Sequence, residues 1–160
     1  MRSKFAIMGH PLHPTLVAIP VGLFVWTLVA DIVFGIRQEQ EWYNIAFWSG
    51  IAAWITGVGA ALPGFGDYFT IGRKSSAANI GLAHMVFNVT TVGCYIAAMF
   101  MMFDNDAFDL GTNYQVALGL HSFGVLLLAA SGWLGGEMVY RHHLAVIPSR
   151  EEPVSWRRAA

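Results

Sequence analysis

Charged residues are scarce in this 160-residue chain, at 12%, whereas soluble domains carry about 25%. Hydrophobic residues make up 56%, and mean hydropathy is +0.52. So little charge cannot cover a water-facing surface, which excludes an ordinary soluble domain. The formal net charge is −1, and no block of basic residues occurs, so we expect no nucleic-acid partner.

Cysteine is nearly absent, because Cys94 is the single one and it lies inside an apolar run. One thiol excludes an intramolecular disulfide, and it provides no cysteine pair for a zinc or iron–sulfur site. Cys94 therefore indicates neither a redox compartment nor a metal site.

Four long apolar runs account for most of the chain, and each reaches the roughly 20 residues that cross a bilayer as a helix. None alternates with period two, and backbone groups in lipid must be satisfied within the segment, which favours helices. We expect an all-α bundle of four transmembrane helices in residues 1–147, followed by a short cytoplasmic tail, 148–160. The four runs are 14–36, 43–69, 77–103 and 114–140.

The basic residues predict the orientation, because cations concentrate on the cytoplasmic side of membrane proteins. Three clusters precede the first run, separate the second from the third, and follow the fourth, whereas Arg37 alone lies on the other side. We therefore expect both ends inside, in a bacterial cytoplasmic (inner) membrane, with the lipid bilayer as surroundings. We also expect Trp42, Tyr43 and Tyr114 at the outer interface and Tyr68, Phe69 and Tyr140 at the inner one.

A weak internal repeat relates positions 71 residues apart. It predicts two helical hairpins repeated in the same orientation, related by an axis along the membrane normal. The matched pairs are His13 with His84, Val21 with Val92, Gly22 with Gly93, and Tyr43 with Tyr114.

Histidines are the first candidates for chemistry. His10 and His13 each precede a proline, which favours extended backbone at both. Two interpretations stay open for this segment, a rigid two-imidazole clamp and an interfacial entry loop. His84 shares a helix face with Asn88, and an ionisable residue in a membrane helix indicates a functional site.

Other polar residues have simpler interpretations. His121 points about 160° away from Glu137 on a helix, so we expect a structural role for it, or a second, outer site. Glu137 has Arg141 four residues later, in the favourable order for an ion pair. Asp31 lies near the outer end of the first run, where we expect it to reach the interface.

Two site chemistries suit the polar residues predicted on the inner side. His13 and His84 are candidate axial ligands of a b-type haem held between helices. A non-haem transition metal is the alternative, because imidazoles and carboxylates ligate iron, manganese, zinc and copper. The candidate metal ligands are His10, His13, His84, Asp67 and Glu137, with Asn88 as a supporting polar residue.

Several motifs resemble the bacterial membrane family called domain of unknown function 2231. They are Gly-His-Pro-Leu-His-Pro at 9–14, Gly66-Asp67, Ala83-His84 with Asn88, and the run from Ser131 to His142. The resemblance covers roughly residues 8–147. His143 stands where the family usually has a glycine. Some relatives are joined to Rieske iron–sulfur domains, and the resemblance therefore implies a redox setting, although this chain lacks the Rieske Cys-His pairs.

These observations favour a small redox or metal-binding membrane subunit that serves redox partner proteins and is not itself an enzyme. A structural or assembly subunit with polar residues for helix packing is one alternative. A small proton- or ion-coupled transporter is the other.

Overall fold

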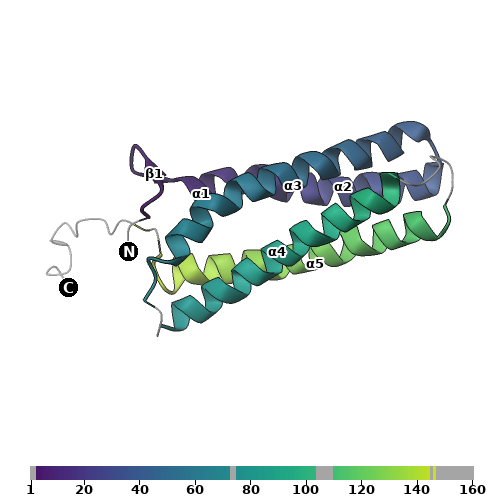
Figure 1. The fold of residues 1–160 in the computed structure, drawn as a ribbon. Helices are drawn as coiled ribbons and strands as arrows, with labels where there is room; N and C mark the ends of the chain where they lie inside the picture. The colour runs from purple at the N-terminus through teal and green to yellow at the C-terminus, as the bar shows by residue number, and fades with distance from the viewer. Residues whose placement is uncertain (1–2, 73–74, 104–109, 145, 147–160) are drawn as a thin grey trace, which may run out of the picture.

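The computed structural model describes residues 3–72, 75–103, 110–144 and 146. Four helical spans run side by side as two antiparallel hairpins, and α1 begins at the same end of the bundle at which α5 ends (Figure 1). We call this end the terminal end, and the other the distal end. The helices are α1 (Leu12–Leu16), α2 (Ala18–Arg37), α3 (Gln40–Tyr68), α4 (Ser76–Phe103) and α5 (Thr112–Tyr140).

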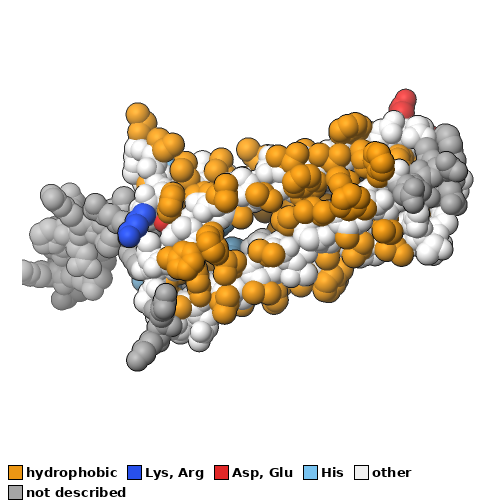
Figure 2. Space-filling model, in the orientation of Figure 1, with side chains coloured by type: hydrophobic (Ala, Val, Ile, Leu, Met, Phe, Trp, Pro, Cys, Tyr) orange, Lys and Arg blue, Asp and Glu red, His pale blue; other side chains and the backbone are white. Residues whose placement is uncertain are grey.

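Each span is long and apolar enough to cross a membrane, and α1 with α2 counts as one span. Large hydrophobic side chains cover the outside of the bundle (Figure 2), and Trp48, Leu126 and Trp133 are more than half exposed. An apolar exterior of this extent fits lipid as the surrounding solvent. The predicted four-helix membrane bundle is thereby confirmed, and each predicted run matches a span to within about three residues at either end.

The first span is interrupted at Val17, which separates α1 from α2. Pro20 has no N–H to donate to the carbonyl of Leu16, so the hydrogen-bond ladder is interrupted one turn before the proline. The proline therefore accounts for a break in the first span.

The expectation of extended backbone at both histidines holds for His10 and is wrong for His13. His10 lies in β2 (His10–Pro11), which pairs antiparallel with β1 (Ala6–Ile7) through a two-residue turn. Both turn residues, Met8 and Gly9, have positive φ angles, the geometry of a tight hairpin. His13 is helical because Pro11 is the extended N-cap of α1, so Pro14 lies in the first turn, where its missing N–H costs nothing.

The predicted repeat is present in three dimensions, with α1–α3 forming one half and α4–α5 the other. Tyr43 donates its hydroxyl to the carbonyl of Met102, and Tyr114 donates to the carbonyl of Asp31. Tyr43 and Tyr114 are 71 positions apart, and so are Asp31 and Met102. The two bonds are therefore the same contact, exchanged between the halves by a pseudo-two-fold axis.

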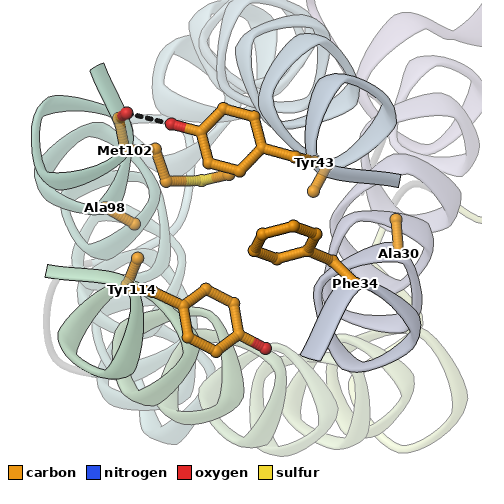
Figure 3. Close-up of a cluster of buried hydrophobic side chains, with 8 residues drawn as sticks. Ala30, Phe34, Tyr43, Ala98, Met102 and Tyr114 are labelled. Atoms are coloured by element: carbon orange, nitrogen blue, oxygen red, sulfur yellow. Dashed lines mark hydrogen bonds between the residues drawn. The ribbon is translucent and has the colours of Figure 1, made fainter. Parts of the chain in front are cut away.

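Tyr43 and Tyr114 lie near the distal end, as expected, but their side chains face the interior of the bundle and not the interface. Both are buried in a cluster at the distal end, where Phe34 packs edge-on against the two rings (Figure 3). Ala30, Ala46, Ala98 and Ala117 provide the space for the large side chains. Buried phenols find partners for their hydroxyls, and here two backbone carbonyls serve.

Small residues on α3 let the first half pack closely. Gly50 faces Thr27, Gly57 faces Phe24, and Gly64 faces His13. Membrane helices approach one another at such stripes because no Cβ separates the backbones. The chain then turns at the terminal end after α5, where His143 has a φ of 49°. That left-handed conformation is the one glycine adopts most readily, which fits the glycine usual at this position in the resembled family.

Candidate functional site: two histidines between the halves

The repeat brings His13 and His84 together at the contact of the two halves. Their ring centroids are 6.1 Å apart, and the ring planes are perpendicular. Both side chains are partly buried. In Figure 2, histidine atoms are visible in a recess between the hydrophobic side chains of the two hairpins. The pair predicted from spacing alone is therefore a pair in space.

Matching backbone contacts orient the two imidazoles. Nδ1 of His13 lies 2.7 Å from the carbonyl oxygen of Ala60, and Nδ1 of His84 lies 2.9 Å from that of Ser131. Ala60 and Ser131 are again 71 positions apart. A carbonyl oxygen only accepts, so each Nδ1 carries the proton, and each Nε2 keeps a lone pair.

The two Nε2 atoms have different surroundings. The amide nitrogen of Asn88 lies 3.2 Å from Nε2 of His84, and it also approaches Ser131 Oγ at 2.5 Å. Within the described residues, Nε2 of His13 has no hydrogen-bond partner. A glycine lies beside each ring, Gly64 at His13 and Gly135 at His84, and these two are also 71 apart. Because these glycines have no side chains, the two imidazole rings can occupy the space beside them.

The remaining candidate ligands lie elsewhere, with partners of their own. His10 is exposed in β2, and its Nδ1 lies 3.2 Å from the carbonyl of Met8. Asp67 accepts hydrogen bonds from Ser3 Oγ at 2.5 Å and from the Lys4 amide at 2.9 Å. Glu137 pairs with Arg141 at 2.8 Å, as predicted. Across the described ranges, no three His, Cys, Asp or Glu side chains are close enough to hold one metal ion.

The structure also shows a polar pair that the sequence did not indicate. Asp31 on α2 and His121 on α5 are bonded through Oδ2 and Nδ1, and both are almost fully buried. The expected interfacial position of Asp31 is wrong, because its helix face turns toward α5. Nothing in the sequence around Asp31 distinguished that face, since α2 is apolar on nearly every side.

Comparison with known proteins gives one family. Its model, described as a predicted membrane protein, matches residues 9–148, nearly the whole chain. No curated protein and no solved structure matches the chain. With four spans that fit a bilayer and this match over most of its length, the chain is a multi-pass membrane protein that belongs to the DUF2231 family.

Proposed function

We propose that the protein is a small redox subunit that holds a b-type haem between His13 and His84. The observation that carries the proposal is the pair of imidazoles itself, contributed by equivalent positions of the two halves. Each ring is oriented through Nδ1 by a backbone carbonyl. Histidines that ligate metals are commonly held in this way, with Nε2 directed to the ion.

The separation of the rings supports a group shared by both histidines. Their ring centroids are 6.1 Å apart, so one haem iron would be held by Nε2 of His13 and Nε2 of His84. Asn88 would have to turn away from Nε2 of His84, and its amide would keep Ser131 Oγ as a partner.

The donor set favours haem over a non-haem ion. Two neutral imidazoles would complete the coordination of a porphyrin iron, whereas a non-haem ion such as zinc is usually held by three or four protein ligands. His10, Asp67 and Glu137 were candidates for those further ligands, but their present contacts keep them apart from the pair. A bound haem would supply one-electron transfer, so the subunit would pass electrons to partner proteins and need no substrate of its own.

Absorption spectra of the purified protein, produced with ample haem, test the proposal. We expect a Soret band, with α and β bands that sharpen on reduction by dithionite. His13→Ala and His84→Ala should each abolish this low-spin spectrum, whereas the exposed His10→Ala should leave it unchanged. A flat visible region in the unsubstituted protein would contradict haem binding, and elemental analysis would then test a non-haem metal.

A second candidate function has its own supporting observation. His84, Asn88 and Ser131 already bond one another between α4 and α5, which suits a structural or assembly subunit. In that case, His84→Ala lowers the melting temperature and removes no chromophore or metal. Such hydrogen bonds between membrane helices typically contribute about 0.6–2 kcal/mol.

A further inference from the structure

A cavity of about 340 Å³ lies at the terminal end of the bundle, where α3 ends and α4 begins. Its volume is within the range of sites that bind small molecules. One side is formed by the end of α3 and the residues that follow it, and the other side by the first turn of α4. The described residues that line the cavity are Tyr68, Phe69, Ile71, Ala78 and Asn79.

Two polar side chains of this lining have no hydrogen-bond partner. Neither the Tyr68 hydroxyl nor the Asn79 amide makes a hydrogen bond with the part of the chain that the structure describes. A phenol donates one hydrogen bond and also accepts, and a carboxamide has a donor and an acceptor. Both groups are therefore free to bond a ligand in the cavity.

A second cavity, of about 290 Å³, lies at the distal end and has a similar lining that includes Tyr43 and Asn44. There, the Tyr43 hydroxyl donates to the carbonyl of Met102, and Oδ1 of Asn44 accepts a hydrogen bond from Gln40. A tyrosine and an asparagine thus line both cavities, but only those of the terminal cavity both lack partners. This difference singles out the terminal cavity as a candidate binding site.

The terminal cavity lies close to the histidine pair. The ring of Tyr68 packs against Gly81 on α4, where an added Cβ would lie 3.2 Å from Cδ2 of the ring. Ala78 and Asn79 precede His84 by six and five residues, which is about 7.5–9 Å along the helix axis. A ligand in the cavity would therefore lie within about two helical turns of His84.

The surface of α4 next to the cavity is exposed and apolar. Asn79 is followed by Leu82, Val86 and Val89 at spacings of three and four residues, so the four side chains share one face of the helix. All four are exposed, and so is Phe69 on the other side of the cavity. A molecule with a polar ring and an apolar tail can place the ring in the cavity and the tail along this lipid-facing surface.

The lining favours a neutral, planar ring. None of the described lining residues is charged, and the rings of Tyr68 and Phe69 lie with centroids 5.9 Å apart. Aromatic side chains pack well against other planar rings. A hydroxyl and an amide can donate to carbonyl oxygens or accept from hydroxyls, which are the polar groups of a quinone and of its quinol.

We propose that the terminal cavity binds the ring of a membrane quinone, whose tail lies along the exposed face of α4. The Tyr68 hydroxyl and the Asn79 amide bond the ring oxygens. The choice of a quinone rests on the proposed redox function, because a lipid-soluble carrier can bring electrons to a haem inside the bilayer. The cavity and its two free polar groups do not depend on that function.

Binding of a benzoquinone with a ten-carbon tail tests this site. The protein is purified in detergent without haem and titrated by calorimetry, and we expect saturable binding of one quinone per chain. Tyr68→Phe and Asn79→Ala should each weaken binding about five- to tenfold, the usual effect of one lost hydrogen bond. Tyr140→Phe and Asn44→Ala are the matched controls, because both residues are exposed and neither lines this cavity. They should bind the quinone as the unsubstituted protein does.

Several results would overturn the proposal. The absence of saturable binding would do so, and unchanged affinity in both Tyr68→Phe and Asn79→Ala would place the quinone elsewhere. Equal binding of an alcohol with the same tail would show a site for apolar chains only, and displacement by an equal amount of an anionic phospholipid would assign the cavity to lipid.

The absorption spectra separate this proposal from the haem proposal. Quinone binding that depends on Tyr68 in a protein with a flat visible region would support the quinone site and contradict the haem. A haem spectrum in a protein that binds no quinone would support the haem and overturn the quinone site.

Discussion

At the scale of single residues, we expect substitution of either member of the Asp31–His121 pair to lower the stability of the protein. Each side chain is buried with the other as its partner, and removal of one leaves the other unsatisfied. Buried hydrogen-bonding groups without a partner cost about 1–3 kcal/mol, and more when charged. Removing one member of the pair should therefore destabilise the protein more than replacing both members together.

We accordingly predict strong non-additivity for this pair. Asp31→Met alone and His121→Gly alone should each lower the free energy of unfolding by about 1–3 kcal/mol. The double variant should lose clearly less than the sum, because neither unsatisfied group remains. Thermal or denaturant unfolding in detergent measures the cycle. Additive losses would show that the two side chains do not depend on each other.

At the same scale, the sequence identified some residues and missed others for a definite reason. His13 and His84 were paired correctly because a repeat relates positions in space even when no partner is visible in the sequence. Asp31, Tyr43 and Tyr114 were assigned to the interface because distance from the end of a run gives depth only. To predict which way a side chain points around the helix axis, the sequence must show an amphipathic pattern. Helices surrounded by lipid largely lack such a pattern.

At the scale of elements, the contact of α1 with α3 depends on a missing side chain. A Cβ built at Gly64 would lie 2.6 Å from Nδ1 of His13, too close for any real contact. The glycine therefore lets His13 reach the carbonyl of Ala60 across the helix interface.

Gly64→Ala should displace His13 and destabilise the protein by about 1–3 kcal/mol, the usual cost of overpacking. Gly59→Ala is the control on the same helix, because nothing lies within 4 Å of its Cβ position. Alanine favours a helix over glycine by about 1 kcal/mol, so Gly59→Ala should be neutral or stabilising. Melting temperatures compare the two variants. An unchanged melting temperature for Gly64→Ala would show that the ring moves without cost.

Helix bounds were the easier part to predict from the sequence. The length of an apolar run is set by membrane thickness, and the spans follow from it directly. The break at Val17 lies one turn before Pro20, because a proline removes the hydrogen bond to the carbonyl four residues earlier. His13 is helical because Pro11 is the N-cap of α1. Local preferences alone do not tell which of the three nearby prolines precedes the start of the helix.

At the scale of the whole molecule, the start of α1 and the end of α5 lie at one end of the bundle (Figure 1), so four spans would put both on one side of a membrane. The cations then predict which side. Lys4 and Arg141 lie at the terminal end, whereas Arg37 lies at the distal end and pairs with Glu39. This bias in basic residues predicts that the terminal end is cytoplasmic.

Reporter fusions in a bacterial host measure this orientation. Green fluorescent protein fused to either end should fluoresce, because it folds in the cytoplasm. Alkaline phosphatase inserted at Gly111, beside the distal end of α5, should be active, because it requires the opposite compartment. Moving the cations, with Arg37→Gln combined with two lysines added at the distal loop, should weaken the bias. Active phosphatase at both ends would reverse the assignment.

The exchanged bonds of Tyr43 and Tyr114 have a consequence for what the two halves can hold. In a homodimer of one hairpin, symmetry would make every substitution appear in both copies. Within one chain the halves need not be identical, so Asp31 bonds His121 while Met102 and Gly50 occupy the equivalent positions. Joining two halves in one chain thus allows a symmetric scaffold to hold an asymmetric interior.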